Sequence, residues 1–348
     1  MALSLRAGRR RLHSPAALAS TLCYVSPSTD PYTNLAFEDW LVRTTDPQQY
    51  VLYLWRNRPT VVIGRNQNPW KECALGLMRA RDVWLARRTS GGGAVYHDLG
   101  NTNYTVLMPR AAFSRDTCAE MAARALQQLD VPAHVTARHD VAVGDRKVSG
   151  SAFRLTSARA FHHGTMLVDA DLARLSGCLR SPHADHIDAR GVDSVRSPVA
   201  NLRDYSLAVD HDAFCDAVRR QFVAMFGPAR DMPFSADVND EMRRRIGAWE
   251  WLYGQTPDFE HRMERHFPWA TISGHIAAHR GHIAAVNLAL PPMALGAPPH
   301  ISKALADIGA LLSGARYDRA AVAERLALAR TGSAHAAELC DWIEAAFQ

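Results

Sequence analysis

The chain has 348 residues, of which 47% are hydrophobic, so it is long enough to bury a large core and to divide into two domains. Its net charge of +5 is small for this length, and no basic stripe is interleaved with aromatic residues as in nucleic-acid-binding modules. No stretch approaches the roughly 18 consecutive apolar residues of a membrane span, and the six cysteines lie far apart without a C-x-x-C pair. These features argue against nucleic-acid partners, membrane insertion, a zinc site and a disulfide framework.

The N-terminal segment is basic and contains no acidic residue before Asp30. Four arginines and His13 stand there among alanines and serines, a composition typical of a mitochondrial transit peptide. We therefore predict a transit peptide over residues 1–25 and a location in the mitochondrial matrix. A disordered basic tail on a cytosolic protein is the alternative that this composition leaves open.

Hydrophobic periodicity and turn residues predict a mixture of helices and strands along the first half of the chain. A helix with one apolar side is expected at 34–42, entered through Asp30 and Pro31. The further elements expected in chain order are strands at 51–55, 60–63 and 103–108, a helix at 117–129, and a turn at 142–146 that leads into a strand with Lys147. Because these elements do not alternate regularly as strand, helix, strand, the pattern favours the α+β class.

The stretch that opens at Gly227 contains several prolines and is the best linker in the sequence. We therefore divide the chain into a larger domain over 30–226, a linker over 227–240 and a smaller domain over 241–348. In the smaller domain, apolar residues at helical spacing are followed by the end signal of one helix and the cap of the next. These residues are Ile301, Leu305, Ile308, Leu312, Gly314 and Asp318.

The segment 87–103 carries the clearest functional signal in the chain. It combines Arg87 and Arg88 with three consecutive glycines at 91–93 and several hydrogen-bonding side chains. Glycines let backbone N–H groups approach an anion closely, and arginines donate charge-assisted hydrogen bonds, so the segment predicts a phosphate or carboxylate site. The spacing matches neither a Walker loop nor a dinucleotide fingerprint. Taken alone, it also suits a glycine-rich hairpin with surface arginines.

Segments on both sides of this loop complete a longer pattern. The sequence G-R-x-Q-N-P precedes it at 64–69, and K-x-S-G-x-A and H-G-T follow at 147–152 and 163–165. Together with R-R-x-S-G-G-G-x-V-x-H-D-x-G-N-x-N at 87–103, these motifs resemble the lipoate–protein ligases and lipoyltransferases. The resemblance implies a biotin/lipoyl protein ligase-like catalytic domain with a mainly antiparallel sheet, joined to a smaller C-terminal α+β accessory domain.

The resemblance extends from about residue 32 to about residue 202. It returns at 249–259, which is similar to the segment that opens the accessory domain in this family. Its details at 67–70 and 72–73 are closest to the mitochondrial lipoyltransferase of animals. The larger domain is therefore expected to be the catalytic one and the smaller the accessory one.

The resemblance implies that the bound substrate is lipoyl-AMP, a mixed anhydride with an electrophilic carbonyl carbon. Attack by an amine builds negative charge on the carbonyl oxygen, so fixed cations and donors matter more than a nucleophile of the enzyme's own. Lys147 matches the family's lysine between acyl carbonyl and phosphate, and Asp140 is a candidate to hold or deprotonate the attacking amine. The other residues expected to bind the substrate are Arg65, Arg87, Arg88, Ser90, Gly91, Gly92, Gly93, His97, Asn101, Asn103, Gly150 and His163.

Some of these residues have a structural alternative. On spacing alone Lys147 would be a solvated turn lysine. The role expected for His97 is to orient the loop rather than to transfer protons, and a satisfied structural histidine explains it equally well. The segment 183–188 holds two histidines and two aspartates at a spacing that could ligate a divalent ion. A polar surface loop explains that segment better, and we predict no metal site.

Three functions are compatible with these motifs. The favoured one is transfer of a lipoyl group, from lipoyl-AMP or from a lipoylated H protein of glycine cleavage, to a lysine ε-amine on lipoyl domains of 2-oxoacid dehydrogenase complexes. The second is a complete lipoate–protein ligase that first makes lipoyl-AMP from lipoate, ATP and Mg²⁺. The third is a non-catalytic lipoyl-domain binding protein, against which the intact Arg88, glycines and Lys147 argue. We expect a monomer.

Overall fold

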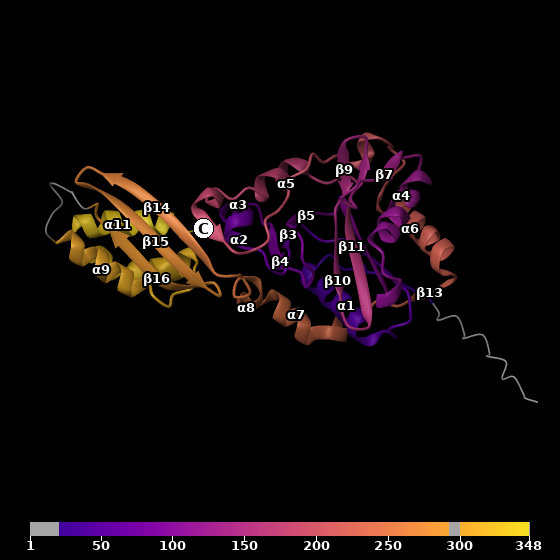
Figure 1. Cartoon of the computed structure of the whole chain (residues 1–348), viewed down its shortest axis with the longest axis horizontal. Coiled ribbons are helices and arrows are strands. Elements are labelled where there is room, and N and C mark those ends of the chain that lie inside the picture. The colour runs from indigo at the N-terminus through magenta and orange to yellow at the C-terminus, as the bar shows by residue number, and fades with distance from the viewer. Residues whose placement is uncertain (1–20, 292–299, 348) are drawn as a thin grey trace, which may run out of the picture.

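The computed structural model describes residues 21–291 and 300–347. These residues form a larger body around a six-stranded sheet and a smaller body in which long strands are covered by helices (Figure 1). The helices α7 (Asp240–Gly247) and α8 (Trp249–Leu252) lead from the larger body into the smaller one. No helix among the described residues has the length and apolar character needed to cross a membrane.

The six-stranded sheet joins segments from both ends of the larger body. Its strands run in the order β10-β11-β6-β2-β1-β13. The pairs from β10 to β2 are antiparallel, whereas β1 lies parallel to both β2 and β13. The bounds are β10 (Ser151–Leu155), β11 (Arg159–Leu167), β6 (Asn101–Pro109), β2 (Val51–Trp55), β1 (Thr21–Val25) and β13 (Ala229–Met232). The α+β class with a mainly antiparallel sheet is confirmed.

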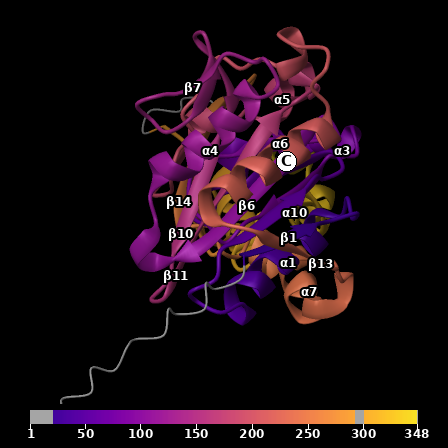
Figure 2. The ribbon, with the colours of Figure 1, turned by 90° about the vertical axis from the view of Figure 1, so that its right-hand side faces the viewer.

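Helices cover both faces of this sheet, which explains why every residue of β2 is buried. Leu52 and Leu54 pack beneath α4 (Arg115–Gln127) and α6 (His211–Phe226), which lie across one face in Figure 2. Val51, Tyr53 and Trp55, which alternate with them along the strand, pack on the other face beneath α1 (Pro31–Thr44). The predicted strands at 51–55 and 60–63 are confirmed residue for residue.

Helix α1 begins three residues before the predicted helix at 34–42. The Asp30 carboxylate accepts hydrogen bonds from the backbone N–H groups of Tyr32 and Thr33, and Pro31 occupies the first turn. Because the side that faces the sheet includes the buried polar side chains Asn34 and Glu38, α1 contributes more than apolar packing. These two residues lie one helical turn apart and face the same region.

Two small sheets flank the large one. In the first, β3 (Thr60–Ile63) lies between β4 (Trp84–Arg87) and β5 (Val95–His97), parallel to β4 and antiparallel to β5. The glycine segment between β4 and β5 therefore crosses from one side of β3 to the other and is not a hairpin. The second small sheet is antiparallel and consists of β7 (Ala133–Val135), β8 (Val141–Val143) and β9 (Arg146–Ser149). The larger body also contains the short helices α2 (Pro69–Glu72), α3 (Leu75–Ala80) and α5 (Leu172–Cys178).

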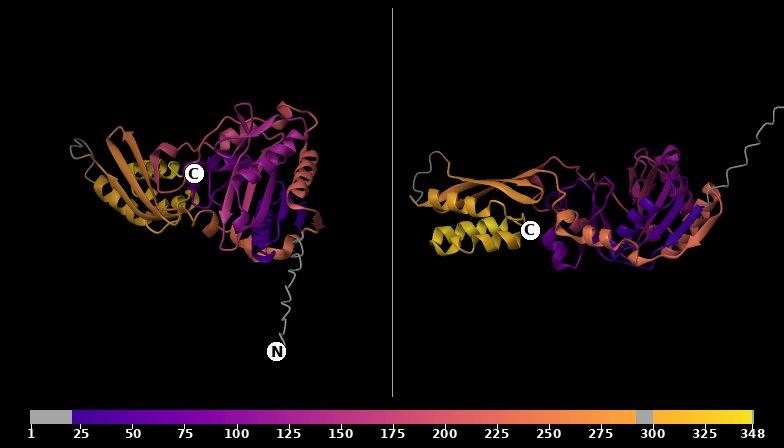
Figure 3. Two further views of the ribbon diagram at one scale, coloured as in Figure 1. Left: turned by 45° about the vertical axis from the view of Figure 1, so that its right-hand side comes forward. Right: turned by 90° about the horizontal axis from the view of Figure 1, so that it is seen from below.

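The smaller body is built on three long antiparallel strands. They are β14 (Phe259–Phe267), β15 (Ala270–His279) and β16 (His282–Ala289). The helices α9 (Ile301–Leu312), α10 (Arg319–Leu326) and α11 (Ala334–Ala345) lie together on one side of them (Figure 3). The two helices predicted before Gly314 and after Asp318 are confirmed, and the Asp318 side chain caps α10 through the N–H of Ala321.

The two bodies share one hydrophobic core. Trp70, which is 2% exposed, follows the G-R-x-Q-N-P motif in α2 and packs its ring against Tyr253, Phe259 and Tyr317. In addition, β12 (Ile187–Ala189), a segment of the larger part of the chain, pairs with the edge of β14. The smaller body is therefore anchored by side-chain packing and by a strand.

Two predicted boundaries differ from the structure. The predicted linker over 227–240 includes β13, whose backbone completes the large sheet beside β1 because parallel pairing is a long-range event that local sequence does not specify. The predicted transit peptide over 1–25 includes β1, whose Leu22, Cys23 and Tyr24 are buried. Residues 1–20 lie outside the described residues, and the mitochondrial location stays a prediction.

Truncation is expected to distinguish the two ends of that predicted peptide. A chain that starts at Thr21 keeps β1, whereas one that starts at Ser26 loses it between β2 and β13. Since each large apolar side chain contributes roughly 1.5–3 kcal/mol when fully buried, the shorter chain should lose several kcal/mol of unfolding free energy relative to the longer one. Urea unfolding followed by circular dichroism measures the difference, and equal stability of the two chains would contradict the role given to β1.

Candidate functional site

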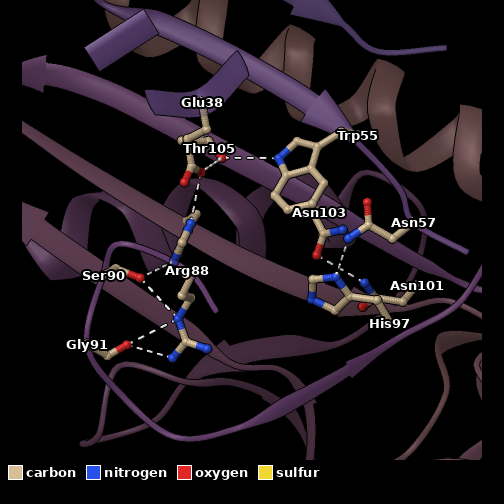
Figure 4. A network of polar contacts seen from close by, with 11 residues as sticks. Glu38, Trp55, Asn57, Arg88, Ser90, Gly91, His97, Asn101, Asn103 and Thr105 are labelled. Carbon is tan, nitrogen blue, oxygen red and sulfur yellow. Dashed lines mark hydrogen bonds and ion pairs between the residues drawn. The ribbon is translucent and has the colours of Figure 1, made fainter. Parts of the chain in front are cut away.

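The glycine segment folds around the guanidinium group of Arg88. This side chain is 4% exposed and donates hydrogen bonds to the carbonyl oxygens of Val62 (3.0 Å) and Gly93 (2.8 Å). It also donates to the Gly91 carbonyl (2.6 Å) and to Ser90 Oγ (3.0 Å), as Figure 4 shows. Burial lowers the pKa of Arg88 to about 10, which still leaves it charged at neutral pH. Arg88 thus sets the shape of the loop, and the positive φ of Gly92 (85°) is the backbone conformation that only glycine adopts without strain there.

A chain of buried hydrogen bonds continues from this loop to helix α1. Ser90 Oγ lies 2.8 Å from His163 Nε2, and His163 Nδ1 lies 2.9 Å from Glu38 Oε1. Thr105 donates its hydroxyl to the same Glu38 oxygen at 2.7 Å, and Trp55 Nε1 donates to Thr105 Oγ1 (Figure 4). The Glu38 carboxylate accepts a hydrogen bond from His163 Nδ1, so His163 carries its proton on Nδ1. Its Nε2 accepts a hydrogen bond from the Ser90 hydroxyl.

A second chain of hydrogen bonds fixes the tautomer of His97. Asn34 Nδ2 lies within hydrogen-bond distance of the carbonyls of Ser28 and Arg56 and of Asn57 Oδ1. With its oxygen on Asn34, Asn57 presents its amide nitrogen to His97 Nδ1 at 3.0 Å. Neutral His97 therefore carries its proton on Nε2. Burial, reinforced by the nearby Arg88 charge, lowers the pKa of His97 to about 3.

Asn101 and Asn103 lie beside His97 at the start of β6. Asn101 Nδ2 donates to Asn103 Oδ1 at 3.1 Å, which leaves the Asn103 amide nitrogen without a partner among the described residues. His97 Nε2 likewise has no described partner. His97 and Asn103 both line a cavity, where each retains a donor that a ligand can use.

Lys147 and Asp140 meet at the mouth of this cavity. Lys147 Nζ on β9 lies 2.9 Å from Asp140 Oδ1, just before β8, and both side chains are partly exposed. The lysine chain lies directly over Gly150, where an added Cβ would come within 2.9 Å of Lys147 Cε. The glycine in the K-x-S-G motif therefore leaves room for the lysine side chain in the position that it occupies here.

Two cavities adjoin at Lys147. The first has a volume of about 320 Å³ and extends from the mouth towards Leu35, Trp55 and Val62. The second has a volume of about 530 Å³ and is lined by several leucines together with basic and hydroxyl side chains. The residues common to both walls are Ala94, Val95, Lys147, Gly150, Thr165, Asp193, Ser194 and Val195.

The structure brings most of the sequence-predicted site residues together. Those that line the first cavity are Arg88, Gly92, Gly93, His97, Asn103, Asp140, Lys147, Gly150 and His163. Ser90, Gly91 and Asn101 do not line it but hold lining residues in place through the hydrogen bonds described above.

Two predicted residues lie elsewhere. Arg65 is exposed and lines neither cavity. Arg87 is fully buried and points away from the cavity, because successive side chains of a strand face opposite sides. Its guanidinium donates to the carbonyls of Leu252 (2.6 Å), Arg65 (2.9 Å) and Gln67 (2.8 Å), so it supports the fold rather than a ligand.

Sequence reasoning missed the polar residues that support the site from behind. Glu38 and Asn34 belong to α1, and Asn57 lies in the loop before β3. The available signal was the spacing of Asn34 and Glu38, four residues apart on the apolar side of an amphipathic helix. Among the residues that the structure describes, no cluster of three or more histidine, cysteine or acidic side chains is arranged to hold a metal ion.

The fold gives the class of the protein. The structure is similar to that of P. falciparum LipL1 in complex with lipoate, with a TM-score of 0.59, 23% identity, and coverage of 94% of this chain and 100% of that one. It is also similar to a bi-partite lipoate protein ligase from Thermoplasma acidophilum, studied with its E2 lipoyl domain, with a TM-score of 0.57 and 26% identity. That match covers 67% of this chain and 96% of the archaeal one. The chain therefore has the fold of the lipoate ligases.

Sequence comparison gives the family. The model of the lipoyl protein ligase A/B catalytic domain matches residues 30–223. Lipoate-protein ligase A of Psychrobacter cryohalolentis is 38% identical over 295 residues, which are 81% of this chain and 87% of the bacterial one. The chain belongs to the lipoyl protein ligase A/B family. The finer resemblance to the animal mitochondrial lipoyltransferase stays a prediction.

Acidification is expected to destabilise the fold through two buried histidines. Burial lowers the pKa values of His97 and His162 to about 3, from about 6.5 in an exposed histidine. Well above pH 6.5 both histidines are neutral in the folded and in the unfolded chain, so they contribute no pH dependence to the unfolding free energy. Between pH 6.5 and 3 the unfolded chain binds protons that the folded chain does not, so stability falls as pH falls.

From pH 7 to pH 5 this amounts to about 2 kcal/mol of unfolding free energy for each histidine. His162 has no described hydrogen-bond partner and lines neither cavity, so His162→Phe should remove its share of the slope. His266→Phe, at a side chain that is 80% exposed, is the control and should leave the slope unchanged. Urea unfolding at a series of pH values measures the slope of the unfolding free energy against pH. A slope in His162→Phe identical to that of the parent protein would contradict the lowered pKa of His162.

Proposed function

We propose that this protein forms the amide bond between a lipoyl group, carried as lipoyl-AMP, and the ε-amine of a lysine on the lipoyl domains of 2-oxoacid dehydrogenase complexes. The observation that carries the proposal is the position of Lys147, which stands where the two cavities join and lies 2.9 Å from Asp140. Family membership supports the same reaction class.

The two cavities suit the two halves of an acyl adenylate. The first is lined by the apolar side chains of Leu35 and Val62 and by the polar side chains of Lys147 and Asp140, as a short acyl chain with a reactive carboxyl end requires. The second offers Arg180 and Arg196 for phosphate oxygens, and its leucines offer apolar contact to a base. We therefore assign the lipoyl chain to the first cavity and the nucleotide to the second, with the anhydride beside Lys147.

The proposed transfer step follows from this placement. The acceptor amine attacks the carbonyl carbon, the new C–N bond forms, and the C–O bond to the phosphate breaks, so that AMP leaves as an anion. The Lys147 ammonium stabilises the charge that develops on the carbonyl and phosphate oxygens. Asp140 accepts the proton that the amine loses, since it lies at the mouth where an acceptor lysine would enter.

A second candidate function is the complete ATP-dependent ligase. The bacterial relative named lipoate-protein ligase A matches this chain over both bodies, with 87% of its own length covered. In that case the same second cavity would receive ATP with Mg²⁺ and the first would receive free lipoate. A lipoylated H protein as the donor is the third possibility for the source of the acyl group.

Three donors distinguish these possibilities. The purified protein is mixed with an apo lipoyl domain and with lipoyl-AMP, lipoate plus Mg-ATP, or lipoylated H protein, and the acceptor mass is measured. Modification by lipoyl-AMP is expected. Equal success with lipoate plus Mg-ATP would establish the ligase, and modification from H protein would establish a relay between proteins. Failure with all three donors would overturn the proposed function and favour a lipoyl-domain binding protein.

Lys147→Ala is expected to lower kcat for transfer from lipoyl-AMP by roughly 100- to 1000-fold, the usual loss when one preorganised donor is removed. Lys303→Ala is the control, because Lys303 is exposed on α9 and lines neither cavity. Rates are measured with saturating lipoyl-AMP and apo lipoyl domain. A Lys147→Ala enzyme within a few-fold of the parent rate would remove Lys147 from the transfer step.

A further inference from the structure

One part of the wall shared by the two cavities is an irregular loop over residues 190–198. This loop contains no helix or strand, and its residues Asp193, Ser194 and Val195 line both cavities. Val192 and Val195 are 45% and 64% exposed, so burial of its own apolar side chains does not hold the loop. Its position must be fixed by contacts with neighbouring segments.

Gln67 makes the central contact with this loop. Its side chain is completely buried, and Nε2 donates to the Val192 carbonyl at 3.1 Å and to Ser194 Oγ at 3.0 Å. At the other end of the amide, Oε1 accepts from the Gly64 N–H at 2.9 Å. Both hydrogens of the Gln67 amide therefore form hydrogen bonds with the loop, and the amide oxygen accepts a hydrogen bond from the turn that follows β3.

The neighbours of Gln67 bring the same segments together. Ser194 Oγ also accepts from the Ala94 N–H at 2.9 Å, which joins the loop to the end of the glycine segment. The Val192 N–H donates to the Asn66 carbonyl, and an added Cβ at Gly191 would lie only 2.7 Å from that carbonyl oxygen. Three segments thus meet at close range around one buried amide.

Gln67 is itself held from the opposite side. Arg87 donates to the carbonyl of Gln67 at 2.8 Å and, through the same guanidinium, to Leu252 and Thr256 at the entry to the smaller body. The backbone of Gln67 is therefore rigidly placed before its side chain reaches the loop. Gln67 lines neither cavity, so its effect on a ligand is indirect.

We propose that Gln67 is a positioning residue for the donor substrate. Resting on the proposed function, the inference is that Gln67 holds the 190–198 loop against the glycine segment, so that the wall on which the acyl adenylate binds is formed before the substrate arrives. A preformed wall lowers the ordering cost of binding and so acts on the KM for lipoyl-AMP. Gln67 is assigned no role in the transfer step at Lys147 or in the encounter with the acceptor.

The test is Gln67→Glu, which keeps the side-chain shape and the acceptor for Gly64 but removes both donors to the loop. Gln48→Glu, at an exposed residue, adds the same charge and serves as the control. Amide hydrogen exchange of the substrate-free protein, read by mass spectrometry, should be about 10- to 100-fold faster in peptides from 190–198 and unchanged in β2 and β6. The KM for lipoyl-AMP should rise by about tenfold, with kcat and the KM for the acceptor domain within about threefold.

Ser194→Ala is the second variant, because it removes the other partner of the same hydrogen bond. Combined with Gln67→Glu, it should increase loop exchange by less than the product of the two single effects, since the Gln67–Ser194 hydrogen bond is lost in both single variants. Unchanged exchange of 190–198 in Gln67→Glu, or a loss confined to kcat, would overturn the inference. If no variant and no parent enzyme transfers a lipoyl group, the proposed function fails while the exchange result still decides the role of Gln67.

Discussion

The arrangement of the site depends on two buried guanidinium groups at the end of one strand. Arg87 and Arg88 are adjacent, are 0% and 4% exposed, and point to opposite sides of β4. Backbone carbonyl and hydroxyl oxygens surround both groups, because a buried charge is tolerated only where polar atoms replace its water. One arginine organises the glycine segment, and the other fixes the turn after β3 to the entry of the smaller body. The cavity walls follow from these two sets of hydrogen bonds.

Local sequence specified much of this architecture. The strands at 51–55 and 60–63, the capped helix after Asp30 and the helix pair around Gly314 all carry short-range signals, and the structure confirms them. The pairing of β13 with β1 and of β12 with β14 carries no such signal, because it joins segments far apart in the chain. Sequence patterns therefore predicted the elements better than the boundaries between the two bodies.

The site shows the same division between local and long-range information. The resemblance to the lipoate ligases implied that Lys147, Asp140, Arg88 and His163 belong to one site, and they line one cavity. It could not decide which of two adjacent arginines faces that cavity, since the answer depends on how β4 is rotated in the fold. Nor did it predict Glu38, which reaches the site from a helix more than 120 residues before His163. Such supporting residues become visible only when buried hydrogen bonds are traced.

The pairing of β12 with β14 limits how independent the smaller body can be. Ile187–Ala189, from the larger part of the chain, covers the edge of β14, and Trp70 fills the core beneath it. An isolated C-terminal fragment would expose that strand edge together with an apolar surface, which is the combination that favours aggregation. The two bodies are therefore poor candidates for modular exchange between relatives, even where each is recognisable as a unit.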